Sequence, residues 1–130
     1  MSYSSAAIIL YKQKKILLQL RDERAPTLKN TWALFGGGIE VGETALQAVM
    51  RECKEELSYS LKDPQEVFMR TKADGSHRYV YVEEYDEQQK LVLGEGAAMK
   101  WFSKKDVATI NMITTYKELI MELYSQQLFE

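Results

Sequence analysis

Residues 36–59 read GGGIEVGETALQAVMRECKEELSY, and the rest of the chain is organised around this stretch. Three glycines lead through a short acidic turn into a segment with helical periodicity. Thr44, followed three positions later by Gln47, forms the capping-box pattern that begins a helix. Apolar residues at helical spacing then predict the side of this helix that faces the core, and they are Leu46, Val49, Met50, Cys53 and Leu57.

The same helix carries a cluster of carboxylates. At about 100° per residue, Glu52, Glu55 and Glu56 fall in one sector beside the apolar stripe. Like charges at this spacing cost a helix about 0.2–0.5 kcal/mol per pair, and Arg51 offsets only part of that cost by reaching Glu55. Such a cluster is typical either of a solvated face or of a site for a hard cation such as Mg²⁺. Glu43 before the helix, and glycines that let the backbone pass close to a ligand, favour the cation site.

The spacing of these residues resembles the signature of the Nudix hydrolase superfamily, which includes MutT. That signature is G-x5-E-x7-R-E-U-x-E-E-x-G-U, where U is a bulky apolar residue. The positions in register are Gly37, Glu43, Arg51, Glu52, Glu55 and Glu56. Cys53 and Tyr59 take apolar positions, whereas Ser58 stands where the pattern has the glycine that closes the last helical turn. Phe35 stands where many members have proline.

The resemblance implies an α/β fold, namely a Nudix-type α/β/α sandwich with a mixed β-sheet, in one domain of residues 1–130. It also implies hydrolysis of a pyrophosphate bond in a nucleoside diphosphate linked to another group, by attack of water on phosphorus. Mg²⁺, or Mn²⁺ in its place, would neutralise the phosphate charge. The expected substrate is a small nucleotide, such as a nucleoside triphosphate or its oxidised form. Two alternatives are a catalytically silent Nudix-like module that binds a nucleotide, and an unrelated acidic-helix interaction domain.

Carboxylates of the central helix are the candidate metal ligands and catalysts. Glu52 and Glu56, one turn apart, are the principal candidate ligands, and Glu55 between them is a third ligand or the general base. By resemblance, the Gly36 carbonyl is a further ligand, although a tight turn needing positive φ explains that glycine equally well. The general base is either a glutamate of this stretch or the distal Glu95 in LGEGAAMKWF.

Several residues outside the carboxylate cluster are candidates for supporting roles. Arg51 is expected to orient Glu55 or Glu43, or else to form a structural salt bridge. The candidate substrate-binding residues are Arg21, Arg24, Gly37 and Gly38. Aromatic residues that could stack on a base are Trp32, Tyr79, Tyr81 and Phe102, although an aromatic in a strand is more often part of the core. His77 lies beside a predicted turn and is not expected to be catalytic.

The remaining chain predicts short strands with helices among and after them. The predicted strands are 6–11, 16–21, 32–35, 66–71, 78–85 and 99–102, and the further helices are 104–109 and 113–128. A hairpin turns at Asp74-Gly75. Alternation of tyrosine and valine over residues 79–82 indicates a strand covered on both faces. This order favours a mixed sheet with helices on both sides.

Composition excludes several classes of protein. The 130 residues suit one domain, with 45% hydrophobic and 28% charged residues, as in ordinary globular proteins. A net charge of -2 gives no reason to expect a nucleic-acid polymer or an anionic membrane as partner. The single cysteine, Cys53, excludes an internal disulfide, and the N-terminal apolar run is too short for a signal or membrane segment. We therefore expect a cytoplasmic protein, with a homodimer left open by the apolar face of the last helix.

Overall fold

The structure is a computed structural model, and it describes residues 4–21, 30–94 and 98–130. The strands are β1 (Ser5–Lys12), β2 (Lys15–Leu20), β3 (Trp32–Ala33), β4 (Phe35–Gly38), β5 (Gln65–Thr71), β6 (His77–Glu84) and β7 (Ala98–Ser103). The helices are α1 (Ala45–Leu57), α2 (Lys104–Val107) and α3 (Thr114–Ser125). The predicted elements are therefore present, with ends shifted by one to three residues.

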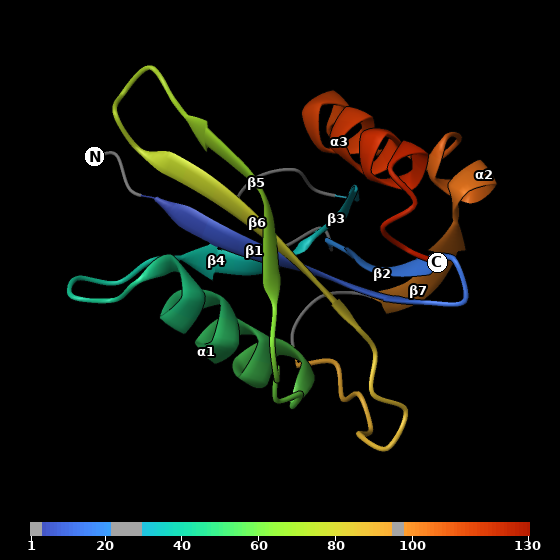
Figure 1. Cartoon of the computed structure of the whole chain (residues 1–130), viewed down its shortest axis with the longest axis horizontal. Helices are drawn as coiled ribbons and strands as arrows, with labels where there is room; N and C mark the ends of the chain where they lie inside the picture. Colours follow the sequence, from blue (N-terminus) through green and yellow to red (C-terminus); the bar gives the residue numbers. More distant parts are fainter. Residues whose placement is uncertain (1–3, 22–29, 95–97) are drawn as a thin grey trace.

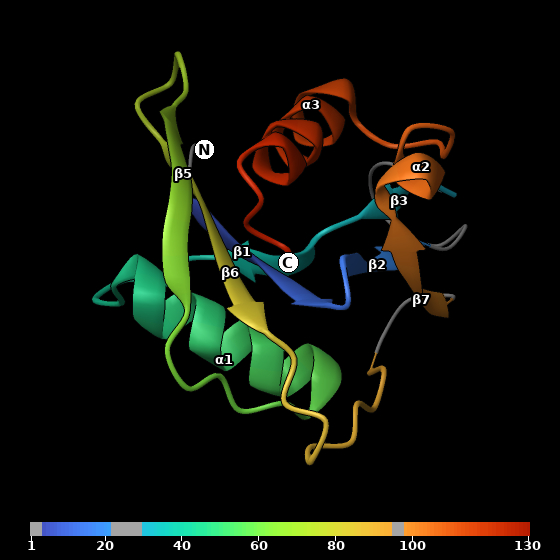
Figure 2. The same ribbon diagram turned by 45° about the vertical axis from the view of Figure 1, so that its right-hand side comes forward.

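The strands form one mixed sheet between helical layers. Its order is β3-β2-β1-β6-β5, with β4 paired to β1 and β7 paired to β2. The pairing of β1 with β6 is parallel, whereas the other strand pairs are antiparallel. Helix α1 covers one face of the sheet, and α3 with α2 lies on the other (Figures 1 and 2). This arrangement confirms the α/β/α sandwich.

Each face of the sheet has its own hydrophobic core, as the alternation in β6 predicts. Tyr79 and Tyr81 belong to the core under α1, whereas Val80 and Val82 belong to the core under α3. The last helix contributes Ile120 and other apolar residues to the second core. None of the described helices is long and apolar enough to cross a membrane.

The glycines of the motif lie in a strand, which the sequence did not predict. Instead of one strand over 32–35, the chain forms β3 and then β4, which takes in three glycines. Gly36 has φ +148°, and a Cβ there would overlap the carbonyl oxygen of Ala6 and lie 2.7 Å from the Cα of Ala7. Only glycine lets β4 approach β1 this closely.

Local signals fix both ends of α1. The Thr44 hydroxyl accepts from the Gln47 N–H while the Gln47 side chain accepts from the Thr44 N–H, so the capping box is confirmed. At the other end Ser58 has φ 54° and ψ 33°, and its N–H donates to the Lys54 carbonyl. Serine thus adopts the left-handed conformation in which the motif normally places glycine.

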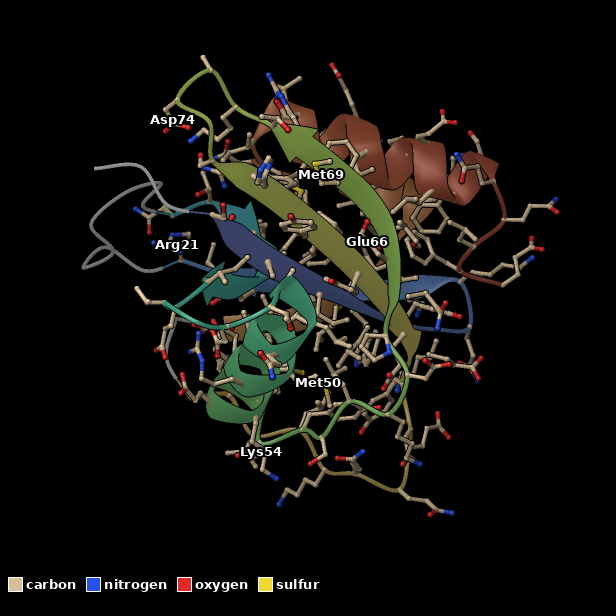
Figure 3. All side chains as sticks on the ribbon, turned by 60° about the vertical axis from the view of Figure 1, so that its left-hand side comes forward. Arg21, Met50, Lys54, Glu66, Met69 and Asp74 are labelled. Carbon is tan, nitrogen blue, oxygen red and sulfur yellow. The ribbon has the colours of Figure 1, made fainter. Side chains whose placement is uncertain are left out.

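The predicted apolar stripe of α1 is wrong at two positions. Leu46 is 43% exposed and Met50, labelled in Figure 3, is 39% exposed. The buried residues of the helix are Ala48, Val49, Cys53 and Leu57. On the helical wheel, Glu52 and Glu56 fall in the sector between the buried Ala48 and Val49. The helix is therefore turned so that these two glutamates face the sheet. Met50 lies beyond the outer edge of this buried arc, and Leu46 lies in the first turn of the helix, before the buried residues begin.

Candidate active site

The glycine strand makes room for two carboxylates of α1. A Cβ at position 37 would lie 2.5 Å from Oε1 of Glu52, so this carboxylate occupies the space beside β4 that a side chain would fill. The Glu52 side chain is only 16% exposed. The N–H of Gly36 donates to Oε1 of Glu56 at 2.8 Å. Consecutive glycines therefore hold Glu52 and Glu56 side by side at the edge of the α1 core.

Glu56 is a partly buried acid whose charge is poorly compensated. Burial, followed by the negative charge of Glu52, raises the pKa of Glu56 to about 7, although the Gly36 N–H and the Gln19 amide stabilise the ionised form. An acid in this state gains from any cation that approaches it. Hard oxygen donors held together in this way suit Mg²⁺ or Mn²⁺. The donor chemistry of Glu52 and Glu56 therefore fits the predicted metal.

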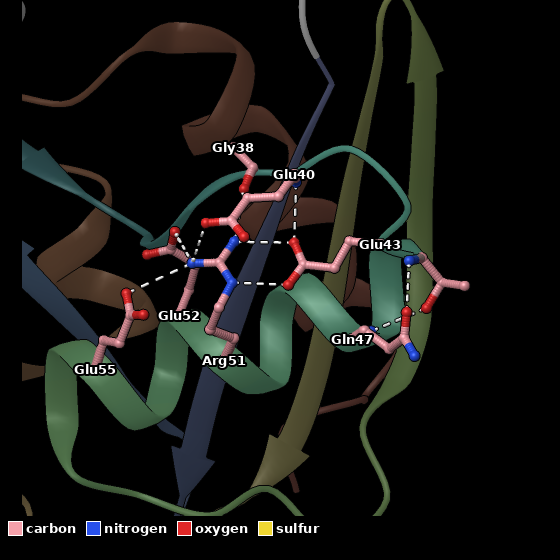
Figure 4. Close-up of polar contacts among 8 residues, drawn as sticks. Gly38, Glu40, Glu43, Gln47, Arg51, Glu52 and Glu55 are labelled. Atoms are coloured by element: carbon pink, nitrogen blue, oxygen red, sulfur yellow. Dashed lines mark hydrogen bonds and ion pairs between the residues drawn. The ribbon is translucent and has the colours of Figure 1, made fainter.

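Arg51 connects the glycine strand, the turn before α1 and the helix itself (Figure 4). Its Nε and Nη2 donate to the two carboxylate oxygens of Glu43 at 2.7 and 3.0 Å, and Nη2 also donates to the carbonyl of Gly38 at 3.0 Å. Its Nη1 donates to Glu52 at 2.9 Å and to Glu55 at 3.5 Å. Arg51 thus contacts both of its expected partners, and a bidentate pair with Glu43 is its strongest contact.

The same contacts change the acid–base properties of this pair. Hydrogen bonds from Arg51 lower the pKa of Glu43 to about 2, and the Glu40 N–H adds a further hydrogen bond at 2.9 Å. The Glu43 carboxylate in turn raises the pKa of Arg51. Both groups are therefore charged across the whole range in which proteins work, and they form a fixed frame beside Glu52.

Glu55 is the most exposed of the three helix carboxylates. Its side chain is 60% exposed, and among the described residues its hydrogen-bond partner is Arg51. Within the described ranges, no group of three or more His, Cys, Asp or Glu side chains has the arrangement that would hold a metal ion. The reason is visible in the contacts, because Arg51 draws Glu52 and Glu55 toward itself while Gly36 ties Glu56. The Gly36 carbonyl stays a predicted ligand.

A pocket of about 160 Å³ opens beside the glycine strand on the α3 face of the sheet. Its lining residues include Gly36 and Gly37 of the glycine strand, Trp32 and the candidate Arg21. Of the four aromatic candidates only Trp32 lines this pocket, with Phe102 behind it in an edge-to-face contact at 4.7 Å. A larger hollow of about 690 Å³, over the end of β6, contains no residue of the motif. The smaller pocket is therefore the one that adjoins the candidate site.

Two candidates, Arg24 and Glu95, lie outside the described residues. Next to Glu95 in the sequence, Gly94 donates its N–H to the carbonyl of Glu56 at 2.8 Å. The carbonyl of Gly38, a predicted substrate contact, accepts from Arg51. His77 bonds to Thr71 through Nδ1 at 3.0 Å, away from the carboxylates.

Sequence reasoning missed three residues that border the site. Gln19 is buried on β2, and its amide bonds to the Leu34 carbonyl and to Glu56. A polar residue within the apolar run ILLQL was the signal for it. Arg78 and Tyr116 line the pocket from β6 and α3, where no local pattern indicates their approach.

This combination of an α/β/α sandwich, a glycine strand and a helix with paired carboxylates defines a class of proteins. A sequence model described as the NUDIX domain matches residues 1–123, and the chain belongs to the NUDIX family. Among curated relatives, a nudix hydrolase of Caenorhabditis elegans is 29% identical over 118 residues, which cover 82% of this chain and 30% of that protein. The nucleoside triphosphatase NudI of Escherichia fergusonii is 35% identical over 75 residues, which cover 52% of each chain. The chain thus spans between 30% and about half of the length of these relatives.

Solved structures share the fold at low sequence identity. A structure from work on MutT of Aliivibrio salmonicida and Vibrio cholerae aligns with a TM-score of 0.81 at 20% identity, covering 95% of this chain and 98% of that one. The NUDIX domain of Shewanella oneidensis NrtR, in complex with ADP ribose, aligns with a TM-score of 0.77 at 20% identity, covering 98% of this chain and 89% of that one. These likenesses confirm the architecture.

Proposed function

We propose that this protein hydrolyses a phosphoanhydride bond in a nucleoside diphosphate linked to another group, and that its substrates are nucleoside triphosphates or their oxidised forms. The observation that carries the proposal is the pair Glu52 and Glu56, held against Gly37 and Gly36 at the edge of a pocket. The named relatives include a nucleoside triphosphatase, which supports this class of substrate.

The residues of the site have separate roles in metal binding, positioning and proton transfer. Glu52 and Glu56 would hold Mg²⁺ or Mn²⁺, with the Gly36 carbonyl as a further ligand and Glu55 as either a third ligand or the general base. The bound ion would supply charge neutralisation and Lewis-acid polarisation of the phosphates. Arg51, anchored on Glu43, positions the Glu52 carboxylate. Glu55, which is exposed and held only at 3.5 Å, is free to accept a proton from water as general base, and Glu95 is the alternative base.

The substrate lies with its phosphates at the glycines and its nucleoside in the adjoining pocket. Apolar walls from Trp32, Leu34 and Met112 suit a flat ring better than a charged chain. Arg21, at the border of the same pocket, is a predicted phosphate contact together with Arg24, and the Gly37 and Gly38 backbone is predicted to approach the substrate. We expect the protein to act in the cytoplasm on a small nucleotide. Whether it forms a homodimer is an open question.

The test is turnover of a nucleotide panel with Mg²⁺ in ¹⁸O-labelled water, which identifies the phosphorus that water attacks. We expect Glu52→Gln and Glu56→Gln to lower kcat/KM by at least about 100-fold, because even residues behind metal ligands cost about 10- to 100-fold. The matched control is Glu118→Gln on the exposed side of α3, which should retain full activity. The proposal fails if the wild-type protein turns over no nucleotide with either metal, or if both variants keep their activity.

A further inference from the structure

Arg78 is a charged side chain in a pocket whose walls are mainly apolar. Arg78 lies on β6, where it pairs with Ser5 of β1. It lines the pocket together with Tyr116 of α3. Its Nη1 donates to the Tyr116 hydroxyl at 3.1 Å. Within the described part of the chain, this is the one hydrogen bond of the guanidinium, and Arg78 forms no ion pair there. A guanidinium has five N–H donors, so most of them are available to a ligand.

The chemistry of this pocket selects one kind of base edge. A guanidinium only donates hydrogen bonds, and its fork matches two neighbouring acceptors in one plane. Guanine presents O6 and N7 as such a pair, whereas adenine and cytosine each place an N–H₂ donor on that edge. Trp32, Met112 and Ile113 supply walls for a flat ring. The Tyr116 hydroxyl holds Arg78 from the side of α3.

We infer that Arg78, held by Tyr116, reads the O6 and N7 acceptors of a guanine base in this pocket and so determines the base specificity of the enzyme. This inference rests on the proposed function, because it assigns the nucleoside of that substrate to this pocket. Phosphate is the other group that Arg78 could bind. Ser5 of β1 pairs with Gly38 on one side and with Arg78 on the other, so β1 separates Arg78 from the glycines at which we place the phosphates.

The experiment compares four triphosphates that differ only at the base. GTP and ITP both carry O6 and N7, 7-deaza-GTP lacks the N7 acceptor, and ATP carries an N–H₂ group in place of O6. We expect wild-type kcat/KM for GTP and ITP to exceed that for ATP by about 5- to 150-fold, with 7-deaza-GTP between them. Arg78→Met should remove these differences mainly by lowering kcat/KM for GTP and ITP.

Arg70→Met is the matched control, because Arg70 is the pairing partner of Arg78 on β5 and is exposed. This variant should keep the full preference for GTP. If Arg78→Met does not fold, Tyr116→Phe replaces it, since this change removes only the hydroxyl that holds the guanidinium. It should weaken the preference for GTP, with kcat/KM falling more for GTP and ITP than for ATP.

Binding without turnover separates this inference from the proposed function. Trp32 lines the pocket and Trp101 does not, so the Trp101→Phe variant reports GMP and AMP binding in EDTA through Trp32 fluorescence alone. Tighter binding of GMP than of AMP that is lost in Arg78→Met supports the inference, even if no triphosphate is hydrolysed. Turnover of all four triphosphates at equal rates overturns the inference and leaves the hydrolase intact. An equal loss of kcat/KM for all four triphosphates in Arg78→Met also overturns the inference, because such a result assigns Arg78 to the phosphates.

Discussion

Replacement of Glu56 by glutamine tests the central feature of the site, a partly buried acid kept without a full counter-charge. Oε1 of Glu56 accepts from the Gly36 N–H at 2.8 Å, and a glutamine oxygen can keep that bond. The substitution removes the negative charge and preserves the shape of the side chain. In the absence of metal we therefore expect Glu56→Gln to unfold less readily than the wild-type protein at neutral and alkaline pH.

The magnitude follows from the pKa of Glu56. Its ordinary value is 4.5, and burial together with Glu52 raises it to about 7. At 1.36 kcal/mol per pKa unit, ionised Glu56 costs the folded state about 3 kcal/mol relative to the protonated acid. The new amide N–H₂ needs an acceptor of its own, which offsets about 1 kcal/mol of the gain. The expected net gain in unfolding free energy is about 2 kcal/mol at about pH 8.

The contribution of Glu56 to stability depends on pH in the direction opposite to that of a carboxylate with a lowered pKa. Between pH 4.5 and about 7 the folded protein holds a proton on Glu56 that the unfolded chain has lost. The protonated acid therefore stabilises the fold fully below pH 4.5, and this contribution disappears as pH rises through about 7. Since glutamine does not titrate, Glu56→Gln should be about 1 kcal/mol less stable than the wild-type protein at about pH 4, where only the cost of the amide is left, and about 2 kcal/mol more stable at about pH 8.

Urea unfolding in EDTA at these two pH values measures the effect, with Glu118→Gln as the control that should match wild type at both. Addition of Mg²⁺ should then stabilise the wild-type protein more than Glu56→Gln, because the variant lacks a ligand. A variant less stable than wild type at about pH 8, or equally stabilised at both pH values, would refute the account of Glu56 as a partly buried, uncompensated acid.

Three further substitutions follow from the same geometry. Arg51→Lys should lower kcat/KM by about 10- to 100-fold, because one ammonium group cannot hold both oxygens of Glu43 and reach Glu52; steady-state kinetics with full activity would contradict this. Ser58→Gly should raise the unfolding free energy by about 1 kcal/mol, since serine at φ 54° carries a left-handed penalty that glycine avoids; urea titration decides, and a loss of stability counts against it. Gly37→Ala should displace the Glu52 carboxylate, whose Oε1 lies 2.5 Å from the added methyl position, so activity should fall at least about tenfold while the melting temperature changes little. Unchanged kinetics in Gly37→Ala would place Glu52 outside the reaction.

Features that depend on near neighbours in the chain could be predicted from sequence alone. The capping box joins Thr44 and Gln47, which are only three positions apart in the chain, and it is present. Alternation between Tyr81 and its neighbour Val82 reports the two faces of a strand, because successive side chains point in opposite directions. The motif predicted the family for the same reason, since its spacing is a property of one helix and the turn before it.

The orientation of α1 needed the tertiary structure. Hydrophobicity alone predicts that Leu46 and Met50 face inward, yet both are exposed, while Glu52 and Glu56 lie against the glycine strand. That choice depends on β4, which has no side chains where the helix packs, and β4 is in turn placed by its pairing with β1 about thirty residues earlier in the chain.

The sequence by itself therefore determined the order of the elements, apart from the glycine strand β4, and the candidate carboxylates, because hydrophobic periodicity, caps and turns act over a few residues. Only the tertiary structure decided which carboxylates are partly buried and which residues from distant strands and helices border them. Arg78 and Tyr116 meet across 38 positions of the chain, and Gly36 meets Glu56 across 20. Contacts of that range are set by the packing of the sheet between its helices, which no local pattern encodes.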